Sequence, residues 1–401
     1  MKYKSVITYL RMECLRGFLL IIIILFNSSI NILKNVQAQN ALPQANKTDS
    51  HSSQLSEEVR KFLTNRWDAV SFEQGMSLLQ NRRESIGSRK LVLDKLRSKR
   101  RELDPESLQR LHNQVILIAK DTTESPEISA EAIRSMASLI GLMEEKGQIT
   151  KFDVKQDISF LIEVARDQGR DVRLRGSAIR TLGDLQVHDA KPLLLELLAD
   201  QSNLNRPEIA RNACISIWRL EGKEAVVPIS EVLSRTEDPS IFGTAAFSLG
   251  QIKTVESMVN LVKNSDRFPD SASCDAALVD MEDTILDVLK NPQDENLIHA
   301  IYATRHLWRE GQRERYVPQL RMLLSTAPIL ARKAALDRLL EVVSTLKLDD
   351  EKRELEPILI EIVNQPELKQ YTERIRKRML AVELEPTYST IPVPSIPQGN
   401  K

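Results

Sequence analysis

Glycine, aromatic residues and cysteine are all scarce in this chain of 401 residues, which has 13 glycines, 4% aromatic residues and three cysteines. The shortage of aromatic residues argues against a sheet-rich fold, because strands are enriched in aromatic and β-branched residues. Three cysteines are too few for a framework of disulfides. The net charge is zero, so the basic excess typical of a nucleic-acid-binding domain is missing, and a nucleic acid is disfavoured as a partner.

The residues that are present are those of a folded helical protein. Apolar residues make up 42% of the chain and charged residues 28%, which is normal for a soluble protein. Leucine, alanine, glutamate, arginine and lysine are frequent, and these residues favour helix over sheet. The length fits either two domains or one extended array of repeats. We therefore expect an all-α protein.

The first 38 residues have the order of a secretory signal. Four basic residues precede the apolar run 18–26, and Val36 and Ala38 occupy the small-residue positions that signal peptidase reads. We predict cleavage after Ala38 and export to the periplasm or the outside of the cell. The alternative is an uncleaved membrane anchor over residues 17–33, although the apolar run is short for a membrane span.

Composition divides the rest of the chain into four parts. Residues 39–56 are polar without periodicity and predict a disordered linker, and residues 385–401 contain four prolines and predict a disordered tail. Helical periodicity between them predicts an N-terminal helical cap region over residues 57–124 and a repeat array over residues 125–384. Helix starts are expected where a capping residue precedes a proline, at Asp104-Pro105, Ser125-Pro126, Asp238-Pro239 and Asn291-Pro292.

One amphipathic stretch recurs along the chain. The sequence DVRLRGSAIRTLGDL at Asp171–Leu185 returns as RPEIARNACISIWRL at Arg206–Leu220 and as DPSIFGTAAFSLGQI at Asp238–Ile252, and a second apolar stretch follows each copy. A two-helix unit of this size cannot bury its apolar face alone, so stacked copies must share one core. The expected repeat-core positions are Ala178, Leu182, Leu185, Ala213, Ile217, Leu220, Ala245, Leu249 and Ile252.

This pattern, D-x-x-V/I-R-x-x-A-x-x-A-L-G-x-L followed by A-V-P-x-L-x-x-L-L, resembles the short HEAT-like repeat of the phycobilisome-lyase type. The resemblance implies an α-solenoid, a superhelix of stacked antiparallel helix pairs of the HEAT/armadillo kind, and a role in protein binding. The chain departs from the pattern at Trp218, which replaces the glycine found at Gly183 and Gly250. Residues 264–295 are interpreted as an acidic insertion in the array.

Two segments have strongly unbalanced charge. Residues 82–101 contain nine basic and two acidic residues, and the dense end offers Arg97, Lys99, Arg100 and Arg101 as candidates for binding an acidic protein or a membrane surface. The alternative is a solvated helix face or the polar cap of the array. Residues 264–295 contain nine acidic and two basic residues, and they form either an acidic helix face or a patch that binds a partner.

Motifs for catalysis or metal binding are missing from the sequence, so we expect no catalytic residue, no metal and no cofactor. Cys214 falls at a core position of the repeat, and it either pairs with Cys274 after export or stays a buried free thiol. Trp67, Trp218 and Trp308 are expected to pack between repeats.

Three functions remain open at this point. The leading hypothesis is an exported, non-enzymatic HEAT-repeat scaffold that binds a protein or another macromolecule through the solenoid surface. A bilin lyase-like protein that handles a chromophore is the alternative implied by the resemblance. A membrane-anchored assembly factor would share the scaffold and retain residues 1–38.

Overall fold

The computed structural model describes residues 55–147, 151–268, 272–307 and 309–346, all within a unit that begins at Leu55. The signal with its cleavage site at Ala38, most of the linker, the end of the array and the tail lie outside the described residues. Those expectations remain predictions.

Helices account for most of the described residues, and no strand occurs among them, in agreement with the predicted all-α solenoid class. The helices of the first part are α2 (Glu57–Thr64), α3 (Ala69–Gln80), α4 (Ile86–Ser98), α5 (Pro105–Lys120), α6 (Pro126–Glu145), α7 (Lys151–Arg166), α8 (Val172–Asp184) and α9 (Lys191–Ala199). Those of the second part are α10 (Pro207–Glu221), α11 (Val226–Arg235), α12 (Pro239–Ile252), α13 (Val255–Asn264), α14 (Ser273–Val279), α15 (Glu282–Leu289), α16 (Leu297–Ala303), α17 (Glu310–Thr326) and α18 (Ile329–Leu346).

Three of the four expected helix starts are confirmed. The side chains of Asp104, Ser125 and Asp238 accept hydrogen bonds from backbone N–H groups of the first turns of α5, α6 and α12, and a proline follows each cap. The expectation at Asn291-Pro292 is wrong, because α16 begins only at Leu297. Asn291 instead accepts a hydrogen bond from the Gln293 backbone N–H with its side chain, 3.2 Å away, which holds the segment in a turn.

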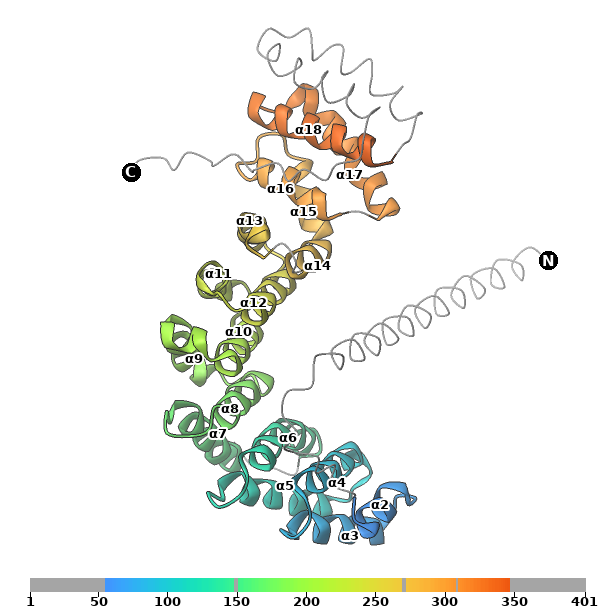
Figure 1. The fold of residues 1–401 in the computed structure, drawn as a ribbon, viewed down its shortest axis with the longest axis vertical. Coiled ribbons are helices and arrows are strands. Elements are labelled where there is room, and N and C mark those ends of the chain that lie inside the picture. Colours follow the sequence, from blue (N-terminus) through green and yellow to red (C-terminus); the bar gives the residue numbers. More distant parts are fainter. Residues whose placement is uncertain (1–54, 148–150, 269–271, 308, 347–401) are drawn as a thin grey trace, which may run out of the picture. The chain divides into compact units, whose positions relative to one another are not determined.

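The helices alternate between two positions in the stack. We call α4, α6, α8, α10 and α12 the A helices, and each of the first four packs on the next one (Figure 1). We call α5, α7, α9, α11 and α13 the B helices, of which α5, α7, α9 and α11 each pack on the A helix that follows in the chain. This alternation is the stacked arrangement of helix pairs that the recurring sequence predicts.

The predicted core positions lie in the core. Ala178, Leu182 and their counterparts in α10 and α12 are buried, while Leu185 and Ile252, at the ends of their helices, are partly buried. Of the predicted core positions, those that are buried are Ala178, Leu182, Ala213, Ile217, Leu220, Ala245 and Leu249. The periodic apolar residues therefore form the continuous core that makes stacking favourable.

Glycine allows a close approach of α8 to α10 and of α12 to α14. A Cβ atom on Gly183 would lie 2.6 Å from the Ser216 Cα of α10, and one on Gly250 would lie 2.9 Å from the Ala277 Cα of α14. Both distances are far inside normal contact, so neither position accepts a side chain without moving a helix. Trp218 has the equivalent position in α10, and its ring meets the Phe247 ring of α12 edge-on at 5.8 Å between centroids.

A side-chain hydrogen bond recurs at the fourth residue after the N-cap of successive A helices. Arg89 Nε donates to the Leu79 carbonyl at 2.8 Å, Ser129 Oγ to the Ile118 carbonyl at 3.2 Å, and Arg175 Nε to the Ala165 carbonyl at 3.1 Å. Each bond satisfies a carbonyl near the end of the preceding helix, where no backbone donor is left. The same kind of hydrogen bond therefore joins α3 to α4, α5 to α6 and α7 to α8. The helices before residue 125 are connected in the same way as the repeat at Arg175, and α4 packs on α6.

The acidic segment 264–295 contains α14 and α15. α14 packs on α12, and Cys274, Ala277 and Leu278 of α14 are buried. The segment expected to interrupt the repeat thus supplies a helix that stacks on the last A helix. Within the part of the chain that the structure describes, no helix is both long and apolar enough to cross a membrane.

Candidate functional site

Three clusters on the A helices and the loops before them each place two arginines around one shared carboxylate. They are the Glu124 cluster (Arg82, Arg89, Glu124), the Glu131 cluster (Arg97, Arg134, Glu131) and the Asp184 cluster (Arg180, Arg219, Asp184). In the first two clusters an arginine also pairs with a second carboxylate, Arg82 with Asp121 and Arg97 with Asp94. This difference, together with burial and hydrogen bonding, decides what each cluster can do.

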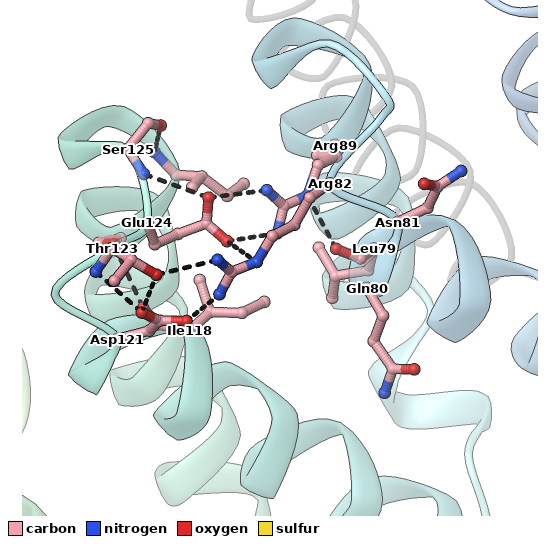
Figure 2. A network of polar contacts seen from close by, with 12 residues as sticks. Leu79, Gln80, Asn81, Arg82, Arg89, Ile118, Asp121, Thr123, Glu124 and Ser125 are labelled. Carbon is pink, nitrogen blue, oxygen red and sulfur yellow. Dashed lines mark hydrogen bonds and ion pairs between the residues drawn. The ribbon is translucent and has the colours of Figure 1, made fainter.

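The Glu124 cluster is a buried joint between two helix pairs (Figure 2). Arg89 donates through Nη1 and Nη2 to the two oxygens of Glu124, at 2.8 and 2.7 Å, and its Nε is bound to the Leu79 carbonyl. The side chains of Arg89 and Glu124 are 4% and 8% exposed. The Arg89 hydrogen bond lowers the pKa of Glu124, against the raising effect of burial. The Arg89 guanidinium and the Glu124 carboxylate therefore neutralise each other within the chain.

Arg82 extends this joint to the surface. Its Nη1 donates to Thr123 Oγ1 at 2.9 Å, its Nη2 pairs with Asp121, and its Nε lies 3.9 Å from a Glu124 oxygen (Figure 2). Two arginines of the predicted basic segment, Arg82 and Arg89, are thus used to hold the loops before α4 and α6 together. Neither offers a free charge to a partner.

The residues proposed from sequence as partner-binding are mostly engaged as well. Arg97 pairs with Asp94 at 2.6 Å and with Glu131 at 2.9 Å, and Lys99 pairs with Glu102 at 2.7 Å. Arg100 Nη1 donates to the Arg97 carbonyl at 2.8 Å. Arg101 is exposed and has no hydrogen bond or ion pair to another described residue.

The structure divides this dense basic run between the end of α4 and a short 3-10 turn, Arg100–Glu102. It therefore does not present the run as one continuous charged face. The prediction that it binds a partner remains untested, with Arg101 as its most accessible member.

The Glu131 cluster links α4, α6 and α8. Glu131 accepts from Arg97 at 2.9 Å through Oε1 and from Arg134 at 2.5 Å through Oε2, and Arg134 Nη1 donates to Ser177 Oγ at 2.9 Å. Burial raises the pKa of Glu131, but the hydrogen bond from Arg134 and the charges of both arginines outweigh it and lower the pKa overall. Both oxygens of this carboxylate are used.

The Asp184 cluster differs because both arginines share one oxygen. Arg180 Nε lies 3.2 Å from Asp184 Oδ1, and Arg219 of α10 pairs with the same atom. The side chains of Arg180 and Arg219 are 30% and 32% exposed. Partial burial lowers the pKa of each arginine, and the charge of Arg180 lowers the pKa of Arg219 further. The two guanidinium groups therefore share a single carboxylate, that of Asp184, which is itself exposed.

Aromatic side chains lie next to the Asp184 cluster. The Arg219 guanidinium is 5.8 Å from the Trp218 ring centroid, and the Trp218 ring meets Phe247 of α12. Phe247 is 48% exposed and Trp218 is partly buried. Arginine and tryptophan are the residues most enriched at the energetic centres of protein interfaces.

These features belong to one line of solvent-facing positions. The ninth residue after the N-cap of each A helix is partly or largely exposed, and we call this set the exposed column: Asp94, Arg134, Arg180, Ile215 and Phe247. The exposed column changes from charged side chains on α4, α6 and α8 to apolar ones on α10 and α12. The Asp184 cluster lies at this change.

Comparison with known proteins locates a repeat in the same region. Residues 174–200 match a family model described as the PBS lyase HEAT-like repeat. The match covers most of α8 and all of α9, and it supports the interpretation of the chain as a HEAT-like repeat protein. Comparison with curated proteins finds no match.

Two solved structures are similar to the chain at low levels. One is the complex of CpcE and CpcF of phycocyanin lyase from Nostoc sp. PCC7120, with a TM-score of 0.37 and 14% identity, covering 70% of this chain and 100% of that chain. The other is human deoxyhypusine hydroxylase in complex with glycerol, with a TM-score of 0.29 and 20% identity, covering 54% of this chain and 75% of that chain.

The acidic residues of segment 264–295 are partly paired. Arg315 of α17 donates to Glu282 at 2.5 Å and to Asp283 at 2.7 Å, and His306 lies 2.7 Å from Asp275. The hydrogen bond from His306 lowers the pKa of Asp275. These contacts of Asp275, Glu282 and Asp283 attach α14 and α15 to the elements that follow.

The remaining polar and sulfur groups are dispersed. Cys214 and Cys274 are both free and buried, and burial raises the pKa of each thiol to about 12. His112 and Asp157 form a buried contact of 3.0 Å between α5 and α7. Within the described ranges, no group of three His, Cys, Asp or Glu side chains is placed to hold a metal ion.

A groove of about 310 Å³ lies between α3 and α5. Arg110 binds Glu73 at 2.6 and 2.9 Å on its wall, and Gln80 Nε2 donates to Gln114 Oε1 at 2.7 Å. The lining residues are Glu73, Met76, Ser77, Gln80, Arg110, Asn113, Gln114 and Leu117. The ion pair and the amide pair use the polar groups of Glu73, Arg110, Gln80 and Gln114 within the chain.

Sequence reasoning missed the Asp184 cluster. Arg219 is separated in the chain from Arg180 and Asp184 by a whole helix pair, and no local excess of charge marks the three residues. Aligning the repeats could have revealed the cluster, because Asp184 and Arg219 fall at the same position of successive copies. Opposite charges at one position of adjacent repeats predict an ion pair across the stack.

Proposed function

We propose that this protein is an exported, non-enzymatic scaffold of HEAT-like repeats that binds a protein partner through the exposed face of its A helices. The observation that carries the proposal is the Asp184 cluster with its aromatic neighbours, Trp218 and Phe247. It combines a surplus of arginine with exposed aromatic area, the composition of an interface centre. Stacked repeats place such groups on a continuous surface that a partner can follow.

Site-specific photo-crosslinking tests where the partner binds. A photo-reactive phenylalanine analogue is placed at Phe247 and, as a control, at Val70 of α3, which is 76% exposed. We expect a discrete crosslinked protein from position 247 in intact cells and none from position 70. Equal crosslinking at both positions, or none at position 247, would contradict the proposed binding face.

Export is the second part of the proposal, and it rests on the order of basic, apolar and small residues before Ala38. Residues 1–45 fused to a reporter that is active only outside the cytoplasm should give activity and a shortened product. Activity without shortening would favour the membrane-anchored alternative over residues 17–33. No activity would refute export.

A bilin-handling role is the second candidate function. It is supported by the description of the family model that matches residues 174–200, which refers to a phycobilisome lyase repeat. Co-expression with a bilin and a phycobiliprotein subunit, followed by absorbance of the purified subunit, tests it. Chromophore attachment that depends on this chain would replace the non-enzymatic scaffold with an enzyme.

A further inference from the structure

We propose that the Asp184 cluster, with Trp218 and Phe247, binds an acidic peptide segment of the partner protein, one that carries a carboxylate next to an apolar side chain. This inference rests on the proposed function and names the chemistry of the partner at that face. It uses three observations: unbalanced charge, open hydrogen-bond donors and adjacent aromatic area.

The first observation is the charge balance between α8 and α10. Arg180 and Arg219 carry two positive charges, and Asp184 carries one negative charge that both arginines contact through the same oxygen. Partial burial strengthens the repulsion between the two guanidinium groups because less water screens it. A second carboxylate would neutralise this surplus.

The second observation is that the cluster has donors to offer. A guanidinium has several N–H donors in a planar fork that matches a carboxylate. Arg180 uses Nε and Arg219 uses Nη1 for Asp184, and their other nitrogens have no acceptor among the described residues. An incoming carboxylate can therefore bind without displacing an existing contact.

The other two clusters lack this property. In the Glu124 cluster, Nε and both Nη groups of Arg89 are bound within the chain. In the Glu131 cluster, both Nη groups of Arg97 are bound, to Glu131 and to Asp94, and both Nη groups of Arg134 are bound, to Ser177 and to Glu131. The arginines of these two clusters thus use both of their Nη groups within the chain, whereas Arg180 leaves both Nη groups unused and Arg219 leaves Nη2 unused among the described residues.

The third observation concerns what lies beside the charge. Trp218 and Phe247 continue the exposed face from Arg219 toward α12, with ring centroids 5.8 Å apart. Such a surface favours a ligand that has an apolar group close to its carboxylate. A phospholipid surface is bound better by a dense group of lysines and arginines than by two arginines that share an aspartate. We therefore favour an acidic peptide over a lipid headgroup.

The test uses the full-length protein and an array of synthetic peptides. Each peptide carries one or two glutamates beside a leucine or phenylalanine in a Gly-Ser background, and a matched peptide carries glutamine instead. Binding of the best acidic peptide is then measured by fluorescence anisotropy at low and at physiological salt. We expect binding to require the glutamate and to weaken as salt rises.

Variants assign the binding to the cluster. Replacing both arginines, Arg180→Gln with Arg219→Gln, should weaken binding at least tenfold, because charge-assisted hydrogen bonds are lost. Asp184→Asn should tighten binding several-fold, because it removes the negative charge that offsets one of the two arginines and repels the peptide carboxylate. The control Arg110→Gln removes an exposed arginine paired with Glu73 on another part of the chain and should leave binding unchanged.

The sign of the Asp184→Asn effect separates this proposal from a purely structural role. If Asp184 only held the arginines in place, its replacement would weaken binding or leave it unchanged, and either result would overturn the proposal. Equal binding of the glutamate and glutamine peptides would overturn it too. Binding of phosphatidylserine vesicles that needs both arginines, with no binding of any peptide, would assign the cluster to lipid instead.

Crosslinking in cells separates this inference from the proposed function. The photo-reactive analogue at position 247 is combined with Arg180→Gln and Arg219→Gln, and circular dichroism confirms that the variant is folded. A strong loss of crosslinked product is expected. An undiminished product would retain the proposed binding face and refute the acidic-peptide inference, whereas no product even from the parent protein would refute both.

Discussion

The Glu124 cluster and the Asp184 cluster contain the same groups, two arginines and one carboxylate, and they have opposite properties. Glu124 and Arg89 are almost fully buried, and every nitrogen of Arg89 is bound within the chain. Asp184 is exposed, and its two arginines keep donors free. Charged residues alone therefore do not define an interaction site: burial and unused hydrogen-bonding capacity do.

The largest effect should follow from removing the buried carboxylate. Glu124→Gln leaves the Arg89 charge buried without a counter-ion, so we expect the free energy of unfolding to fall by about 3–5 kcal/mol. Urea denaturation measures it. Glu73→Gln, which breaks an ion pair whose side chains are about half exposed, is the control and should cost less than about 1 kcal/mol. Equal costs would remove the distinction between the two kinds of pair.

Acid should abolish the stabilisation that the Arg89–Glu124 ion pair gives the parent protein. The pKa of folded Glu124 lies below its ordinary value of 4.5, so its ionised form stabilises the fold fully above that value, and the stabilisation is lost as the pH falls through the lowered folded pKa. The difference in free energy of unfolding between the parent and Glu124→Gln should shrink as the pH falls below the ordinary pKa of 4.5. A difference that stays constant on acidification would show that the ion pair is not its source.

An intermediate effect is expected from the helix contact beside the Asp184 cluster. Gly183→Ala places a methyl group against Ser216 and should separate α8 from α10, at a cost of about 1–3 kcal/mol. The control Gly141→Ala has no atom within 4 Å of the new group and should be neutral or stabilising by about 0.4–1 kcal/mol. Thermal unfolding of both variants tests this, and similar shifts in Tm would disprove the close approach.

The smallest effect belongs to the exposed carboxylate. Asp184→Asn should change the free energy of unfolding by less than about 1 kcal/mol, because solvent screens the pair and both arginines stay partly hydrated. Urea denaturation beside Glu124→Gln gives the comparison directly. A loss as large as that of Glu124→Gln would make the Asp184 cluster a structural joint.

Much of the architecture could be predicted from the recurring sequence. Ala178, Ala213 and Ala245 recur at the spacing of a repeat, and the structure buries all three. The helix starts at Asp104, Ser125 and Asp238 followed from capping and proline, whereas Asn291 did not start a helix because its side chain closes a turn. The acidic segment 264–295 was harder, because its stacking helix, α14, does not repeat the sequence pattern.

The candidate site was predicted less well because the prediction relied on local charge density. Arg97, Lys99 and Arg100 stood out as part of a basic run, yet their partners Glu131, Glu102 and the Arg97 carbonyl satisfy them. Glu131 lies a whole helix pair away in the chain. Counting charges within a segment cannot reveal a counter-ion that only folding brings near.

Periodicity is a local property, so the order of residues was enough to specify helices, their pairing into a repeated unit and the apolar positions that form its core. Which of the arginines remain available was settled by folding, since that depends on contacts between residues about 35 positions apart. Arg89 meets Glu124 in a buried joint, while Arg180 and Arg219 meet at one oxygen of Asp184 near the surface. The energy of a charge depends on its distance to other charges and to water, and these distances exist only in three dimensions.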